Sequence, residues 1–164
     1  MGSVDQPPAP ALETKPKFIF FTDFDGTITQ QDSNDFLIEN FGIGPVRRKE
    51  MFDDILFGRR TFRDAFKEML DGIGLPLNKC IKSLLQNITL DKGFKEFYAW
   101  TRDNNIPVVV LSGGMEPIVR ALLAHLIGED EVKALPILSN NVAARPGKSL
   151  DEEGGWEIAY HDDR

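Results

Sequence analysis

Residues Lys17–Thr29 read KFIFFTDFDGTIT, and this stretch decides the fold class. Its first part, Lys17–Thr22, is short, apolar and rich in aromatic residues, which predicts a strand buried on both faces of a sheet. Asp23 and Asp25 follow at once, separated by one residue and succeeded by Gly26. Ligands of open α/β sheets bind beyond the carboxyl ends of the strands, so we expect both carboxylates to project into such a site.

A second apolar run, Ile106–Leu111, contains three consecutive valines, which favour an extended backbone. Helical periodicity precedes it over Asp91–Asn105 and follows it over Glu116–Ile127. Alternating strands and helices are typical of a Rossmann-like parallel sheet, so we predict the α/β class. Farther along, Ala134–Val142 and Gly154–Tyr160 predict a hairpin.

Residues 32–90 interrupt this alternation, because they show only helical periodicity. The predicted helices are Ser33–Phe41, Pro45–Phe57, Thr61–Leu70 and Leu77–Gln86. We therefore predict an all-helical cap over 32–90, inserted after the first strand of a core that comprises 17–31 and 91–164. Residues 1–16 contain four prolines in a polar segment, which predicts a flexible tail.

The formal charge of −7 and the single cysteine limit the classes of function. An acidic surface repels nucleic acid and anionic membranes at long range, so we expect neither as a partner. The apolar runs are far shorter than the roughly 20 residues of a membrane-spanning helix. Because Cys80 by itself forms neither an internal disulfide nor a multi-cysteine zinc site, we expect a cytoplasmic protein.

Asp23 and Asp25 have the chemistry of a nucleophile and of a general acid–base. Asp23 would attack phosphorus through its carboxylate and form an aspartyl-phosphate. Asp25 would protonate the leaving alkoxide and later activate water, which requires a pKa raised above the value of about 3.9 for free aspartate. The competing interpretation is a polar turn that caps a helix, because Asp and Gly are common in turns.

Ser112-Gly113-Gly114 offers complementary chemistry after the second predicted strand. The serine hydroxyl can donate to a phosphoryl oxygen, and the glycines let backbone N–H groups approach it closely. Two strand ends that carry a nucleophile and an oxyanion donor favour the catalytic interpretation of Asp23 and Asp25 over a simple turn.

These motifs resemble the haloacid dehalogenase superfamily, in its phosphoserine-phosphatase-like branch of small-molecule phosphatases. The resemblance rests on Phe18–Thr29, the helical insertion and Val108–Gly114, and Thr22–Thr29 is similar to fungal polyol phosphatases and methionine-salvage phosphatases. It implies a Mg²⁺-dependent hydrolase of a small phosphorylated metabolite, a polyol or sugar phosphate. Asp23 would be the nucleophile and Asp25 the acid–base.

The same resemblance implies the other site residues. Those that would bind the substrate phosphate are Thr27, Ser112, Gly113 and Gly114. Asp23, through its carboxylate, and Asp25, through its main-chain carbonyl, would hold Mg²⁺, whose charge offsets the repulsion between a carboxylate and a phosphate dianion.

Substrate choice is expected to depend on the cap. Asp32 lies nine positions after Asp23, where phosphoserine phosphatases carry an acid that meets the substrate amine, so it is a candidate substrate ligand. An N-cap role in the following helix explains Asp32 equally well. Three arginines that could reach a second anionic group are Arg59, Arg60 and Arg63, although exposed basic side chains are usually only solvated.

The family's third and fourth motifs, a lysine and an acidic cluster after a further strand, have no clear counterpart here. Lys148 follows Pro146-Gly147 in a predicted turn, and Asp162 and Asp163 do not follow a buried strand. We therefore expect a C-terminally truncated core with little activity of its own. We expect its exposed strand edge to pair with a second copy of the chain in a homodimer.

Three functions stay open from the sequence. The first is a Mg²⁺-dependent phosphomonoesterase. The second is a phospho-accepting receiver module, which also uses an Asp at a strand end, although the large helical insertion argues against it. The third is a non-catalytic remnant that binds phosphate or a partner, which the missing motifs keep open.

Overall fold

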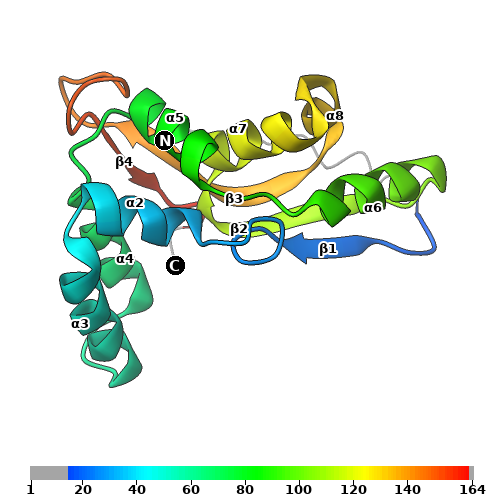
Figure 1. The fold of residues 1–164 in the computed structure, drawn as a ribbon. Helices are drawn as coiled ribbons and strands as arrows, with labels where there is room; N and C mark the ends of the chain where they lie inside the picture. The colour runs from blue at the N-terminus through cyan, green and yellow to red at the C-terminus, as the bar shows by residue number, and fades with distance from the viewer. Residues whose placement is uncertain (1–14, 163–164) are drawn as a thin grey trace.

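A four-stranded sheet forms the centre of the fold in a computed structural model, which describes residues 15–162. The strands are β1 (Phe20–Asp23), β2 (Val108–Met115), β3 (Ile137–Ala144) and β4 (Trp156–Ala159). They lie in the order β1-β2-β3-β4, with β1, β2 and β3 parallel and β4 antiparallel to β3 (Figure 1). The predicted α/β class is therefore confirmed. The predicted tail over 1–16 lies, apart from its last two residues, outside the described residues.

Seven helices accompany the sheet within the described residues. The helices between β1 and β2 are α2 (Ser33–Phe41), α3 (Gly44–Leu56), α4 (Phe62–Asp71), α5 (Leu77–Asn87) and α6 (Lys92–Asp103), and those between β2 and β3 are α7 (Glu116–Ile127) and α8 (Glu129–Ala134). The helical content of 32–90 is as predicted. Helix α8 was not predicted from the sequence. It ends at Ala134, where the predicted strand was expected to begin, and the three acidic residues in its first turn suit a helix N-terminus.

Polar side chains at the helix starts explain why the insertion is helical. Asp32, Thr61 and Asp91 are the N-caps of α2, α4 and α6, and each accepts a hydrogen bond from a backbone N–H of the first turn. The Asp32 carboxylate accepts two, from the N–H groups of Asn34 (2.8 Å) and Asp35 (2.9 Å). The N-cap interpretation of Asp32 is thus confirmed.

One face of the sheet is covered by helices, and the other is partly exposed. Helix α7 packs on β2, β3 and α5, and Phe20 of β1 meets the ring of Phe97 in α6 at a centroid distance of 5.1 Å. On the opposite face Phe21, Leu111 and Leu138 are 59%, 40% and 43% exposed. The prediction that the first strand is buried on both faces is therefore wrong. Within the described residues β1 is an edge strand, because only β2 pairs with it.

The helical insertion is attached to the sheet at several places. Its entry and exit segments are joined by an isolated bridge between Thr29 and Leu90. At the far end, α4 packs against β4, where Lys67 forms an ion pair with Glu157 (3.1 Å). A single hydrophobic core runs through both parts of the chain. No helix among the described residues is long and apolar enough to cross a membrane.

The strand β3 and its partner β4 form the predicted hairpin. Asn141 pairs with Ala159 and Ala144 pairs with Trp156. Lys148 lies in the connecting turn, where its Nζ donates to the carbonyl of Glu153 (2.8 Å). Lys148, the candidate for the lysine of the family's third motif, is therefore hydrogen-bonded within the hairpin.

Candidate active site

The loop after β1 is a tight turn that fixes the two predicted catalytic carboxylates. The carbonyl of Phe24 accepts hydrogen bonds from the N–H groups of Thr27 (3.2 Å), Ile28 (2.9 Å) and Thr29 (3.1 Å). Gly26 has a φ of +75°, a conformation that other residues adopt only under strain. Asp23 and Asp25 therefore leave the end of β1 on a rigid backbone.

Thr29 holds this loop closed, a role that the motif-based prediction does not assign. Its hydroxyl is buried, accepts from the N–H of Gly26 (3.2 Å) and donates to the carbonyl of Phe24 (3.3 Å). Thr27, which the resemblance implies as a phosphate ligand, has an exposed side chain and is absent from the described lining of the cavity between the sheet and α2–α4.

Asp25 is the most constrained carboxylate of the site. Its Oδ1 accepts from the N–H of Ser33 (2.8 Å), and its Oδ2 accepts from Nδ2 of Asn34 (3.0 Å). Burial raises the pKa of Asp25 to about 6, and the negative charges of Asp32 and Asp23 add to the effect, while hydrogen bonds from Ser33 oppose it. A carboxyl with this pKa can hold a proton near neutral pH and give it up again.

Asp23 lies beside the second predicted motif. It pairs in register with Leu111 of β2, directly before Ser112. Its Oδ1 accepts from the N–H of Phe24 (2.7 Å), and its side chain is exposed to the cavity. Its Oδ2 accepts no hydrogen bond from the described residues, so this oxygen is available for attack on a ligand.

The Ser112-Gly113-Gly114 segment lies within β2 rather than after it. The strand continues to Met115, with a register shift between Leu111 and Met115. The Ser112 hydroxyl accepts from the N–H of Gly114 (3.0 Å), and Gly113 and Gly114 line the cavity. Ser112 itself is not among the described lining residues, so only the two glycines directly face the space beside Asp23.

A cavity of about 330 Å³ lies between the carboxyl end of the sheet and the insertion. The sheet end contributes Asp23, Asp25, Gly113 and Gly114, and helices α2, α3 and α4 with their caps contribute Asp32, Asn34, Asp35, Arg48, Phe52, Phe62 and Phe66. Both predicted catalytic residues and Asp32 are thus brought to one site. The cap side is aromatic and acidic, with one cation.

Arg48 is that cation, and the sequence-based search misses it. It forms ion pairs with Asp35 (2.9 Å) and Glu39 (2.7 Å), and its guanidinium lies 5.2 Å from the ring centroid of Phe52. The arginines that the sequence suggests, Arg59, Arg60 and Arg63, are absent from the described lining. They pair with Asp54, Glu68 and Asp162. The i, i+4 spacing of Arg48 and Phe52 puts both on one helix face, and this spacing could have predicted their contact.

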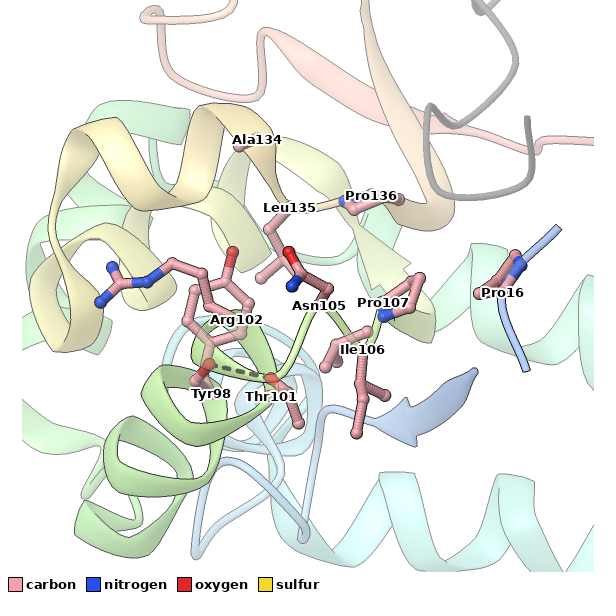
Figure 2. A pocket seen from close by; sticks show the side chains of 11 residues that line it. Pro16, Tyr98, Thr101, Arg102, Asn105, Ile106, Pro107, Ala134, Leu135 and Pro136 are labelled. Carbon is pink, nitrogen blue, oxygen red and sulfur yellow. Dashed lines mark hydrogen bonds between the residues drawn. The ribbon is translucent and has the colours of Figure 1, made fainter. Parts of the chain in front are cut away.

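A larger hollow, of about 480 Å³, lies at the opposite end of the sheet. Figure 2 shows Tyr98 and Arg102 of α6 on one side of it, with Leu135 and Pro136 on the other. It opens at the amino ends of β2 and β3, whereas ligands of open α/β sheets bind at the carboxyl ends. We therefore take the smaller cavity as the candidate active site.

The oxygens at this site suit a hard cation that needs few protein ligands. The carbonyl of Asp25 accepts no hydrogen bond from the described residues, and Oδ1 of Asp23, which accepts the N–H of Phe24, keeps a second lone-pair position for a cation. Mg²⁺ typically binds one or two carboxylates and completes its shell with water and phosphate oxygens. The described residues contain no group of three or more His, Cys, Asp or Glu side chains that could hold a metal ion. The donor set therefore fits Mg²⁺ bound together with a phosphate.

The family model for haloacid dehalogenase-like hydrolases matches residues 20–158. This chain belongs to that family. The match spans the loop after β1, the helical insertion and the hairpin, so the family resemblance of the sequence is confirmed. Membership of this family excludes the receiver-module alternative.

Several curated proteins are similar to this chain in sequence. The chain is 42% identical over 152 residues to Pdp3-interacting factor 1 of Schizosaccharomyces pombe, covering 93% of this chain and 64% of that protein. It is 41% identical over 147 residues to polyol phosphate phosphatase PYP1 of Saccharomyces cerevisiae, covering 90% and 58%. It is 31% identical over 119 residues to the 2-hydroxy-3-keto-5-methylthiopentenyl-1-phosphate phosphatase of Geobacillus thermodenitrificans, covering 72% and 53%. The chain therefore spans about three fifths of the two more similar proteins.

Among solved structures, a substrate-bound phosphoserine phosphatase superposes on the chain with a TM-score of 0.62. The sequence identity is 20%, and the alignment covers 88% of this chain and 64% of that one. This likeness confirms the fold that the resemblance predicts.

Proposed function

We propose that this chain carries the nucleophile and the acid–base of a Mg²⁺-dependent phosphomonoester hydrolase that acts on a small polyol or sugar phosphate. The supporting observation is that Asp23, with a free Oδ2, shares one cavity with Asp25, whose pKa is raised to about 6. The relatives named as phosphatases support the same reaction class.

The reaction would take two steps. Oδ2 of Asp23 attacks phosphorus while the bond from phosphorus to the leaving oxygen breaks, and Asp25 gives its proton to that oxygen. Asp25 then takes a proton from water, whose oxygen attacks phosphorus and releases phosphate from Asp23. The N–H of Gly113 would donate to a phosphoryl oxygen, with the Ser112 hydroxyl, which accepts the N–H of Gly114, behind it. Mg²⁺, held by the Asp23 carboxylate and the Asp25 carbonyl, would supply positive charge against the phosphate.

The cavity favours substrates that carry no charged group besides the phosphate. Four carboxylates line it, and Arg48 is already neutralised by Asp35 and Glu39. A second phosphate or a carboxylate on the substrate would be repelled, whereas hydroxyl groups can donate to Asp32 and Asp35. A polyol or sugar monophosphate has this character, and one relative is named a polyol phosphate phosphatase.

We expect weak turnover from this chain, because one paired arginine is the only cation among the described lining residues. Phosphate release from p-nitrophenyl phosphate and glycerol 1-phosphate with Mg²⁺ tests the proposal. Asp23→Asn should abolish turnover, while Asp130→Asn, on a side chain that is 98% exposed, should not. If the chain binds inorganic phosphate but neither substrate is hydrolysed, the non-catalytic alternative is correct.

A further inference from the structure

Asn34 links the general acid to the glycine segment of β2. Its Nδ2 donates to Oδ2 of Asp25 (3.0 Å), while the backbone N–H of Ser33 donates to Oδ1 (2.8 Å). Both oxygens of the Asp25 carboxyl are therefore held from the first turn of α2. The Asn34 side chain is almost fully buried, since the residue is only 6% exposed.

The other end of this amide is unsatisfied. Oδ1 of Asn34 is buried and has no hydrogen-bond partner within the described residues. Turning the amide over would not help, because an acceptor would then face the Asp25 carboxylate. A buried acceptor without a donor destabilises a fold, and a leucine of similar volume would avoid that cost. The amide therefore serves something other than stability.

The backbone of Gly114 keeps the amide in place. A Cβ at position 114 would lie 3.2 Å from Nδ2 and 3.3 Å from Oδ1 of Asn34, so the amide packs tightly against this glycine. A side chain confined in this way cannot rotate freely, and its donor stays on Oδ2 of Asp25. Each carboxyl oxygen retains a second lone-pair position for the transferable proton.

We propose that Asn34 is a positioning residue, which holds the Asp25 carboxyl in the orientation that delivers its proton to the leaving oxygen. The proposal rests on the proposed phosphatase function and adds a residue to it. Asn34 touches neither the phosphorus nor the nucleophile in this role. Because Asn34 acts through Asp25, the loss of kcat/KM on replacing Asn34 should be larger for a leaving group that needs a proton.

The dependence on the leaving group supplies the test. p-Nitrophenolate leaves without help from an acid, whereas the alkoxide of glycerol 1-phosphate needs a proton as the bond to phosphorus breaks. Asn34→Leu should lower kcat/KM for glycerol 1-phosphate at least about tenfold more than for p-nitrophenyl phosphate, because misplacing a catalytic group by about 1 Å can cost about a hundredfold. Asn40→Leu, the same change on an exposed part of α2, should leave the ratio at its original value.

A second variant and a double-mutant cycle exclude a merely structural effect. Asn34→Asp keeps the shape but loses the donor, so it should change the ratio in the same direction, even if Asn34→Leu fails to fold. In an Asp25→Ala background, Asn34→Leu should cause no further loss with glycerol 1-phosphate.

Equal losses with both substrates, or a full additional loss in the Asp25→Ala background, would overturn the role of Asn34 while leaving the phosphatase function intact. Absence of turnover in the parent chain, or turnover that persists in Asp23→Asn, would instead defeat the proposed function and this proposal with it.

Discussion

Replacing Asp25 by asparagine should stabilise the chain in a pH-dependent manner. In the folded chain the pKa of Asp25 is raised from 3.8 to about 6, first by burial and next by the charge of Asp32. Well below pH 3.8 the carboxyl is protonated in both the folded and the unfolded chain, so it does not change the free energy of unfolding there. As the pH rises to about 6 the unfolded chain ionises first, so stability falls, and above that pH the whole penalty is present.

The size of the effect follows from the pKa difference. A difference of this size corresponds to roughly 3 kcal/mol, and we expect about 2 kcal/mol because water in the cavity screens one side of the carboxyl. The amide introduced at position 25 keeps an oxygen for the N–H of Ser33.

Urea unfolding from about pH 4 to about pH 8, with a chelator to exclude divalent ions, measures this difference. We expect Asp25→Asn to exceed the unfolding free energy of the parent chain by only about 0.5 kcal/mol at the acidic end and by about 2 kcal/mol at the alkaline end. Asp130→Asn, on a carboxylate that is 98% exposed and paired only with the exposed Lys133, should change the unfolding free energy by less than about 0.5 kcal/mol at every pH. Curves for the parent and Asp25→Asn that stay parallel across the range would refute the reasoning.

Three further outcomes are expected from the packing. Gly155→Ala should cost at least about 2 kcal/mol of unfolding free energy, because the added Cβ would lie 2.0 Å from the carbonyl oxygen of Ser149, whereas Gly74→Ala meets no atom within 4 Å and should cost little. The buried Cys80 thiol, its pKa raised to about 12 by burial, should react with an aromatic disulfide reagent only after unfolding. The predicted homodimer should appear in light scattering at high concentration and weaken on Phe21→Lys at the open edge, and a monomeric parent chain would contradict it.

The sequence could predict the parts of the site that depend on local pattern. Asp23, Asp25 and Gly26 form their turn through contacts within a few residues, so the motif carries nearly all the information. Asp32 is similar, because its N-cap hydrogen bonds close within three residues. Even here Thr29 was missed, because its role depends on the loop folding back onto the Phe24 carbonyl.

Residues that depend on helix packing could not be predicted in the same way. Arg48 lies within the predicted helix Pro45–Phe57 and Arg59 lies just beyond its end, so the sequence does not distinguish them. The packing of α3 against α2 brings Arg48 to the cavity. Asn34 looks like an ordinary residue of a capped first turn until the position of Gly114 is known. The exposure of Phe21 was also missed, because an aromatic run has the same composition on an edge strand as on a central one.

The attachments of the helical insertion determine how substrates enter. The bridge between Thr29 and Leu90 joins the entry and exit segments of the insertion, the ion pair between Lys67 and Glu157 ties α4 to β4, and α5 packs on α7. Swinging the insertion aside would break this ion pair and separate α5 from α7, so we expect the mouth of the cavity to keep nearly one width. The site would then act as a sieve, admitting metabolites by size and exchanging products without waiting for a slow opening movement.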